Sequence, residues 1–168
     1  MKYIKRHPLL LEDKNWLVSM KDDIVECSHE LTDLPYNFYH CGREEDGEDY
    51  SYLDYEDGKY TILYTGNLVV GEGKRFVNFD GVISGLWDDS VGLIPDGYSQ
   101  LGSGGFKDLV DSLLPAVEDV IIKLRGIVFN DGEWVGGFTI HSDAQTYNNN
   151  GEDVNYVDIL IKIMFKKK

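Results

Sequence analysis

The sequence predicts an α+β fold in which a mainly antiparallel β-sheet packs against one long helix. Short segments rich in β-branched and aromatic residues alternate with Asp-Gly and other glycine-containing turns, which is typical of antiparallel hairpins. One segment, 106–124, instead repeats its apolar residues with the period of a helix. Because no repeat, low-complexity linker or break in composition divides the chain, we expect one domain over residues 1–168.

Strands and turns are expected through the first two-thirds of the chain. Tyr60–Thr65 follows the turn dipeptide Asp57-Gly58 and is predicted to be a strand, which residues 67–70 either extend or pair with. Arg75–Phe79 alternates with a period of two and is predicted as a second strand. Val82–Trp87 is a third.

One helix is expected from Phe106 to Leu124, where apolar residues recur every three or four positions, as on a helix packed against a core. Pro115 interrupts this pattern because proline has no N–H to donate and its ring clashes with the preceding turn. Two outcomes stay open. We favour one helix kinked at Pro115 over a helix that ends near Leu114 and is followed by a strand around Ile121.

The last third is predicted to return to strands. Ile127–Phe129 and Glu133–Ile140 are expected to form a hairpin around the turn at residues 130–132. A polar loop, Tyr147–Asp153, then leads to a long strand, Val154–Phe165, whose alternate residues form one fully apolar face.

The charge balance limits the function. The chain has 30 Asp and Glu residues against 16 Lys and Arg, a net charge of −14. A negative field repels nucleic acid and anionic membranes and attracts cationic partners, so we expect neither direct nucleic-acid binding nor membrane binding. The apolar run Leu9–Leu11 is too short for a signal peptide, and no run approaches the length of a membrane span. A cytoplasmic location is therefore expected, with Cys27 and Cys41 as free thiols.

The acids are densest between residues 44 and 57, where eight occur without a base and alternate with three tyrosines. Such a block is often a solvated loop. It also suits a surface that covers the Lys- and Arg-lined groove of a nuclease, because tyrosine supplies contact area at interfaces. Trp87 is a second candidate anchor, although packing on the sheet face is its more ordinary role. The residues predicted to bind a partner are Glu44, Glu45, Asp46, Glu48, Asp49, Tyr50, Tyr52, Asp54, Tyr55, Glu56, Asp57, Trp87, Asp88 and Asp89.

Metal and catalytic sites are weakly supported. Four residues have the types needed for a Cys2His2 zinc site, but the spacing within each pair does not match a zinc motif. These four residues are Cys27, His29, His40 and Cys41. No sequence context activates either cysteine as a nucleophile. The segment 54–58 departs from a calcium loop because its glycine comes one position early and Thr65 occupies the place of the final glutamate. No cofactor, metal or catalytic residue is predicted.

Three function classes remain. The favoured one is an acidic cytoplasmic immunity protein that binds and neutralises a basic protein partner, namely a bacterial nuclease toxin. The second is an anti-restriction or anti-defence protein of a phage or mobile element, which would act as a DNA mimic. The third is a metal- or carboxylate-dependent hydrolase, supported only by the number of acids. The sequence does not specify the oligomeric state.

Overall fold

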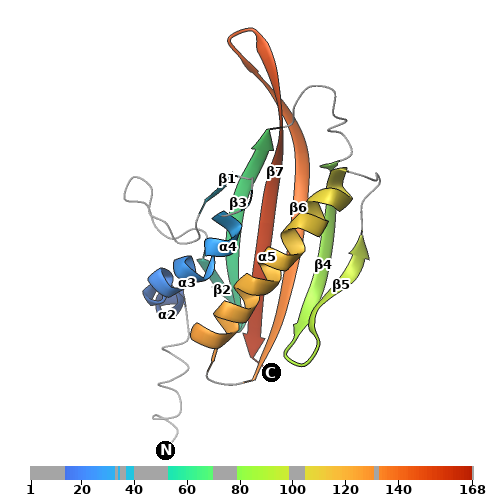
Figure 1. Cartoon of the computed structure of the whole chain (residues 1–168). Helices are drawn as coiled ribbons and strands as arrows, with labels where there is room; N and C mark the ends of the chain where they lie inside the picture. Colours follow the sequence, from blue (N-terminus) through green and yellow to red (C-terminus); the bar gives the residue numbers. More distant parts are fainter. Residues whose placement is uncertain are drawn as a thin grey trace, which may run out of the picture.

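The computed structural model describes residues 14–32, 34, 37–39, 53–69, 79–98, 105–130 and 133–167. The seven strands described there form one antiparallel sheet, and a long helix crosses one face of it diagonally (Figure 1). The predicted α+β class, with a mainly antiparallel sheet packed against one long helix, is confirmed.

The strand order is β1-β3-β7-β6-β4-β5, and β2 also pairs with β3. β1 and β2 lie on the same edge because they pair with different parts of β3, residues 65–67 and 59–62. The predicted strand at Tyr60–Thr65 is the centre of β3, and residues 67–69 extend it. The strands are β1 (Asn37–Tyr39), β2 (Leu53–Glu56), β3 (Lys59–Val69), β4 (Gly81–Asp88), β5 (Gly92–Tyr98), β6 (Trp134–Asn149) and β7 (Glu152–Lys167).

The predicted strands at Val82–Trp87 and Val154–Phe165 are confirmed as parts of β4 and β7. The apolar face predicted for the second of these is fully buried; its residues are Val157, Ile159, Ile161, Ile163 and Phe165. Of the strand predicted at Arg75–Phe79, only Phe79 is among the described residues, and it lies outside any strand.

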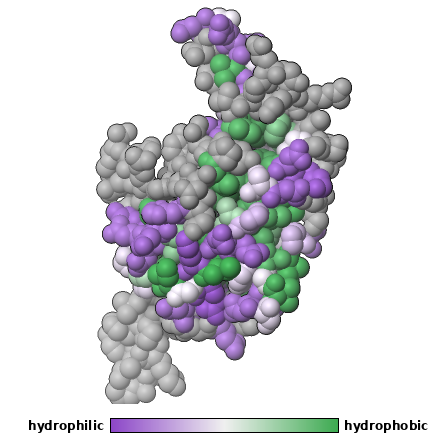
Figure 2. Space-filling view, viewed as in Figure 1, coloured by the Kyte–Doolittle hydropathy of each residue, from purple (hydrophilic) through white to green (hydrophobic). Residues whose placement is uncertain are grey.

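The β6–β7 hairpin corrects the prediction of a polar loop at Tyr147–Asp153. The two strands stay paired up to Asn149 and Glu152, and a two-residue turn of Asn150 (φ 54°) and Gly151 (φ 88°) joins them. Positive φ at both turn residues is the type I′ geometry that Asn-Gly favours. Neighbouring strands end earlier, so residues 144–155 project as a two-stranded arm with a hydrophilic tip (Figures 1 and 2).

The helix α5 (Gly105–Ile127) is continuous through Pro115, and the alternative of a strand around Ile121 is wrong. Pro115 is on the exposed side of the helix, whereas nine apolar residues on the opposite side are buried. Packing of that stripe supplies the stability that the missing N–H removes. The strand predicted at Ile127–Phe129 is also wrong, because Ile127 ends α5 and the N–H groups of Val128 and Phe129 both donate to the carbonyl of Leu124 (2.9 and 2.8 Å).

The first part of the chain corrects the expectation of strands and turns, because residues 14–32 are helical. They form α2 (Lys14–Ser19), α3 (Lys21–Cys27) and α4 (His29–Thr32). These helices pack beside α5 and the β2 edge of the sheet. Five residues spaced three or four apart face the core from them: Leu17, Met20, Ile24, Cys27 and Leu31. No helix in the described ranges is long and apolar enough to cross a membrane.

Candidate protein-binding surface

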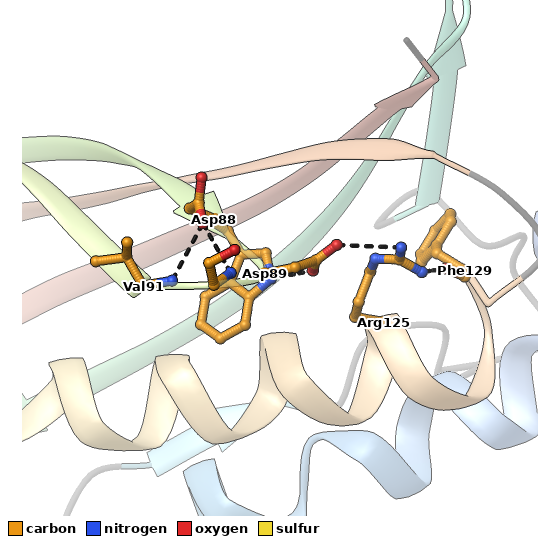
Figure 3. Close-up of polar contacts among 7 residues, drawn as sticks. Asp88, Asp89, Val91, Arg125 and Phe129 are labelled. Carbon is orange, nitrogen blue, oxygen red and sulfur yellow. Dashed lines mark hydrogen bonds and ion pairs between the residues drawn. The ribbon is translucent and has the colours of Figure 1, made fainter.

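The end of β4 and the turn that follows it hold three of the residues predicted to bind a partner: Trp87, Asp88 and Asp89. The carboxylate of Asp88 accepts hydrogen bonds from the N–H groups of Ser90 (2.7 Å) and Val91 (3.1 Å), which closes the turn (Figure 3). Gly92, the first residue of β5 and the partner of Asp88, follows this three-residue loop with a φ of 97°, which glycine adopts without strain. Asp88 therefore has a structural role, while the residue as a whole remains exposed.

Asp89 connects this turn to the C-terminal part of α5. One of its oxygens accepts from the indole N–H of Trp87 (3.0 Å), and the other accepts from Arg125 Nη2 (3.2 Å). Arg125 also donates to the carbonyl of Phe129, so the guanidinium joins the turn to the end of the helix (Figure 3). Because these contacts fix its direction, the exposed carboxylate is preorganised.

Trp87 is half-buried on the helix side of the sheet and packs against the core. Gly136 lies beside it on β6, where a Cβ atom would come within 3.1 Å of the Trp87 Cβ. The absence of a side chain at Gly136 thus makes room for the indole. Packing on the sheet face is the more ordinary of the two roles that the sequence suggested for Trp87.

An open cleft of about 420 Å³ lies between α5 and β5, next to this turn. Four apolar residues and three acids line it: Leu93, Pro95, Leu114 and Pro115, with Asp111, Glu118 and Asp119. A Cβ atom at Gly92 would lie 3.8 Å from the Trp87 ring and 3.9 Å from a Glu118 carboxylate oxygen. The cleft and the Trp87–Asp89 turn therefore form one continuous surface, which we call the acidic cleft.

The charge of the acidic cleft is only partly balanced. Asp111 pairs with Lys107 (2.7 Å), and Asp89 pairs with Arg125. Among the residues with described positions, neither Glu118 nor Asp119 forms an ion pair. Three of these acids, Asp111, Glu118 and Asp119, were not predicted as site residues. These acids recur on the side of α5 opposite its apolar stripe, and this spacing is the sequence pattern that could have identified them.

Most of the acidic block predicted from the sequence lies outside the described residues. This applies to Glu44, Glu45, Asp46, Glu48, Asp49, Tyr50 and Tyr52. Asp54 belongs to β2. Tyr55 is half-buried, and its ring lies 4.7 Å from that of Tyr60, so it packs on the core. Glu56 and Asp57 are exposed, and Asp57 (φ 52°) with Gly58 (φ 78°) forms the predicted turn before β3.

The two groups of predicted residues lie at the same end of the sheet but on opposite edges. Cross-strand register aligns Tyr55, Tyr60, Phe165, Gly136 and Trp87 in one row. At about 4.8 Å per strand, the β2–β3 turn and the β4–β5 turn are roughly 20 Å apart. The structure therefore does not merge them into one patch, and their role in partner binding stays a prediction.

The predicted alternatives for metal ligands are only partly within the described residues. Cys27 is buried in α3, and His29 is exposed on α4, whereas His40 and Cys41 lie outside the described ranges. Where the structure describes the chain, no three His, Cys, Asp or Glu side chains gather closely enough to hold a metal ion.

A pair of like charges lies on the other face of the sheet, at the base of the β6–β7 arm. Asp143 and Asp158 are direct cross-strand partners. Burial raises the pKa of Asp158 above 3.8, and the neighbouring charge of Asp143 raises it further. The folded chain therefore binds this proton more tightly than the unfolded chain does, so ionisation of Asp158 opposes folding at neutral pH.

Replacing Asp158 with asparagine is expected to stabilise the protein at pH 7. The gain should be about 0.5 kcal/mol, because like charges directly opposite each other destabilise a sheet but solvent screens exposed ones. The gain should disappear below the unfolded pKa, where Asp158 is protonated in both states. Urea unfolding of dilute protein at pH 7 and at pH 3 measures this, with Glu152→Gln on the same hairpin as the control. An equal gain at both pH values would contradict the electrostatic cause.

Comparison of the chain with protein-family models, with curated proteins and with solved structures found no match.

Proposed function

We propose that this chain binds a basic protein and neutralises it, and that the partner is a nuclease toxin whose Lys- and Arg-lined groove the chain covers. The observation that carries this proposal is the acidic cleft, where carboxylates of α5 and apolar residues of α5 and β5 line one opening next to Trp87. The net charge of −14 supports it, because a field of that sign speeds the approach of a cationic partner.

The composition of the cleft suits an arginine or lysine side chain. Leu93, Pro95 and Leu114 offer contact to the aliphatic stem of such a residue, and Glu118 and Asp119 offer acceptors to its charged head. A groove that binds phosphates presents these side chains in numbers. The lining of the cleft therefore suits the cationic side chains of a nucleic-acid-binding surface in charge and in apolar contact.

A protein partner fits the dimensions of this end of the molecule better than a small ligand does. The acidic cleft and the exposed Glu56 and Asp57 are separated by roughly 20 Å, the scale of one side of a standard protein interface. Rim charges at such a distance act mainly on the rate of association, whereas residues in the cleft act on dissociation.

The first experiment identifies the partner. The tagged chain is used as bait in lysate of the source cells, and the retained proteins are quantified by mass spectrometry. We expect the retained protein to be basic, and its nuclease activity to fall when the chain is added. Retention of a restriction or related defence enzyme would instead favour the anti-restriction function, and turnover of a small substrate by the purified chain would favour the hydrolase.

A charge-reversal variant tests the cleft. Glu118→Lys with Asp119→Lys is expected to weaken binding of the captured partner at least tenfold, equivalent to about 1.4 kcal/mol, because two attractions become repulsions. The matched control is Glu152→Lys with Asp153→Lys, which makes the same charge change on the exposed arm. A third variant reverses Glu44, Glu45, Asp46, Glu48 and Asp49 and is expected to weaken capture without unfolding the chain.

Titration calorimetry and circular dichroism provide the readouts. If the cleft variant binds as tightly as its control while both remain folded, the acidic cleft is not the recognition surface. If the variant with reversed charges at residues 44–49 binds normally at low salt, the acidic block is excluded in the same way.

A further inference from the structure

The face of the sheet opposite α5 has an unusual composition for a solvated surface. Among the described elements, every helix packs on the α5 side, and none covers this second face. A sheet face open to water is normally filled with polar residues. Here it presents several large aliphatic side chains, of which Leu86, Ile94 and Val135 are 59%, 43% and 41% exposed. We call this surface the open face.

The apolar residues of the open face form two rows that cross the strands. Strand register places Met164, Gly137, Leu86 and Ile94 in one row. A second row contains Leu160, His141 and Val82. The two rows lie on opposite sides of Lys162, since Met164 and Leu160 are each two residues from it along β7. The central row between them holds Leu63, Lys162, Thr139 and Ser84, and the Ser84 and Thr139 hydroxyls are hydrogen-bonded at 3.1 Å. The first of these rows is apolar throughout, whereas His141 interrupts the second; exposed apolar residues gathered in this way are typical of an interaction surface.

Beyond the apolar rows, the two ends of the open face differ in charge: one holds two lysines together with Glu56, the cross-strand partner of Lys59, and the other holds two aspartates. At the C-terminal end of β7, Lys59 and Lys166 are cross-strand partners, and both are exposed. At the end near the arm, Asp158 pairs with Asp143 across the strands. Lys166 and Asp158 lie four residues to either side of Lys162 on the same strand. Lys166 and Asp158 are therefore two opposite charges at equal distances on either side of the central row.

We propose that the open face binds the open face of a second copy of this chain, about a two-fold axis that follows the central row across the strands. This axis places each strand antiparallel to its own copy. It brings Lys166 of one copy onto Asp158 of the other, and the row of Leu86 and Met164 onto the row of Val82 and Leu160. An isologous contact of this type makes every pairing twice.

Two physical arguments support a second copy as the occupant. A lysine brought close to the Asp143–Asp158 pair offsets the repulsion between these two neighbouring carboxylates. The five rows across four to five strands cover roughly 500 Å² on each copy, or about 1,000 Å² in total, the lower limit for a specific interface. Lys162 meets its own copy on the axis, and this like-charge contact opposes association unless both ammonium groups reach water.

The dimer leaves the acidic cleft free, because the cleft is built from α5 and β5 on the other side of the sheet. The inference goes beyond the proposed function and does not depend on it. Two copies joined in this way present two acidic clefts that face away from each other.

Sedimentation of the purified chain tests the proposal. In about 0.15 M salt the long-range repulsion between two acidic copies is screened beyond roughly 8 Å, whereas contacts across the interface persist. We expect the mass at micromolar concentrations to approach twice the 19.1 kDa of one chain. Lys166→Asp and Asp158→Lys should each weaken the dimer at least tenfold, because each places two like-charged pairs in the interface. The double variant should restore the dimer, since it exchanges the partners.

Control variants separate the open face from general effects. Leu86→Glu should weaken the dimer, whereas Ile127→Glu, which charges an equally accessible apolar residue at the end of α5, should leave it unchanged. The pair Glu118→Lys and Asp119→Lys should also leave it unchanged. A monomeric wild-type chain, or a double variant that stays as weak as the single ones, overturns the proposal. A monomer whose open face is protected from hydrogen exchange also overturns it, because the chain itself would then cover that face. A monomer whose open face binds a different protein overturns it as well.

Discussion

Replacing Phe129 with alanine is expected to lower the free energy of unfolding by about 4 kcal/mol, the size typical for a buried phenylalanine. The Phe129 ring is fully buried and stacks on Phe165 at a centroid distance of 4.3 Å. Its other ring contacts are to Trp16, Tyr60 and Trp134. Because these rings come from α2, β3, β6 and β7, removing Phe129 leaves a cavity between four elements that cannot all close around it.

Urea unfolding followed by tryptophan fluorescence measures this loss, since two of the contacting rings are tryptophans. Ile127→Ala is the matched control, because Ile127 is two residues away but 47% exposed, and its replacement should change stability by about 0.5 kcal/mol or less. Phe129→Leu keeps most of the side-chain volume and should fall between the two. A loss below about 1.5 kcal/mol for Phe129→Ala, with an unchanged denaturant slope, would show that the cluster repacks.

Phe129 also shows why one part of the fold was predicted wrongly. Ile127, Val128 and Phe129 have the composition of a strand, but their local preference is overridden by the helix before them. The N–H groups of Val128 and Phe129 complete the last turn of α5, and the Phe129 ring then points into the core. Local propensity could not reveal this, because the deciding contacts come from residues far away in the chain.

The elements that were predicted correctly carry an apolar pattern that is long enough to decide the structure by itself. In β7 every second residue from Val157 to Phe165 is buried, and in α5 the stripe continues past Pro115. The N-terminal helices also have apolar residues at helical spacing, at Leu17, Met20 and Ile24. Each of these helices is only four to seven residues long, which is too short for the pattern to stand out within one element.

The candidate site was predicted in part. Trp87, Asp88 and Asp89 were named from the sequence, and they form one part of the acidic cleft. The acids of α5 that complete the cleft could not be assigned to it, because they join Trp87 only when β5 lies alongside the helix. That arrangement depends on strand order and on the diagonal position of α5, which are long-range properties of the fold.

Replacing Gly85 with alanine is expected to destabilise the protein by about 3 kcal/mol, the upper part of the range for overpacking a core. A Cβ atom at Gly85 would lie 2.4 Å from Cε1 of Phe138 and 2.5 Å from the backbone oxygen of Ile94. Phe138 is fully buried on the neighbouring strand and has no free space to move into. The Ile94 oxygen belongs to the β5 backbone, so it can move only if the pairing of β4 with β5 shifts.

Gly126→Ala is the matched control, and its expected effect has the opposite sign. Gly126 lies within α5, and a Cβ atom there would meet nothing within 4 Å. Alanine is favoured over glycine inside a helix by about 1 kcal/mol, so this variant should be more stable than the parent chain. Thermal and urea unfolding of both variants separate the two causes. If the two replacements shift stability in the same direction, the close packing of Phe138 over Gly85 does not hold the β4–β5 edge in place.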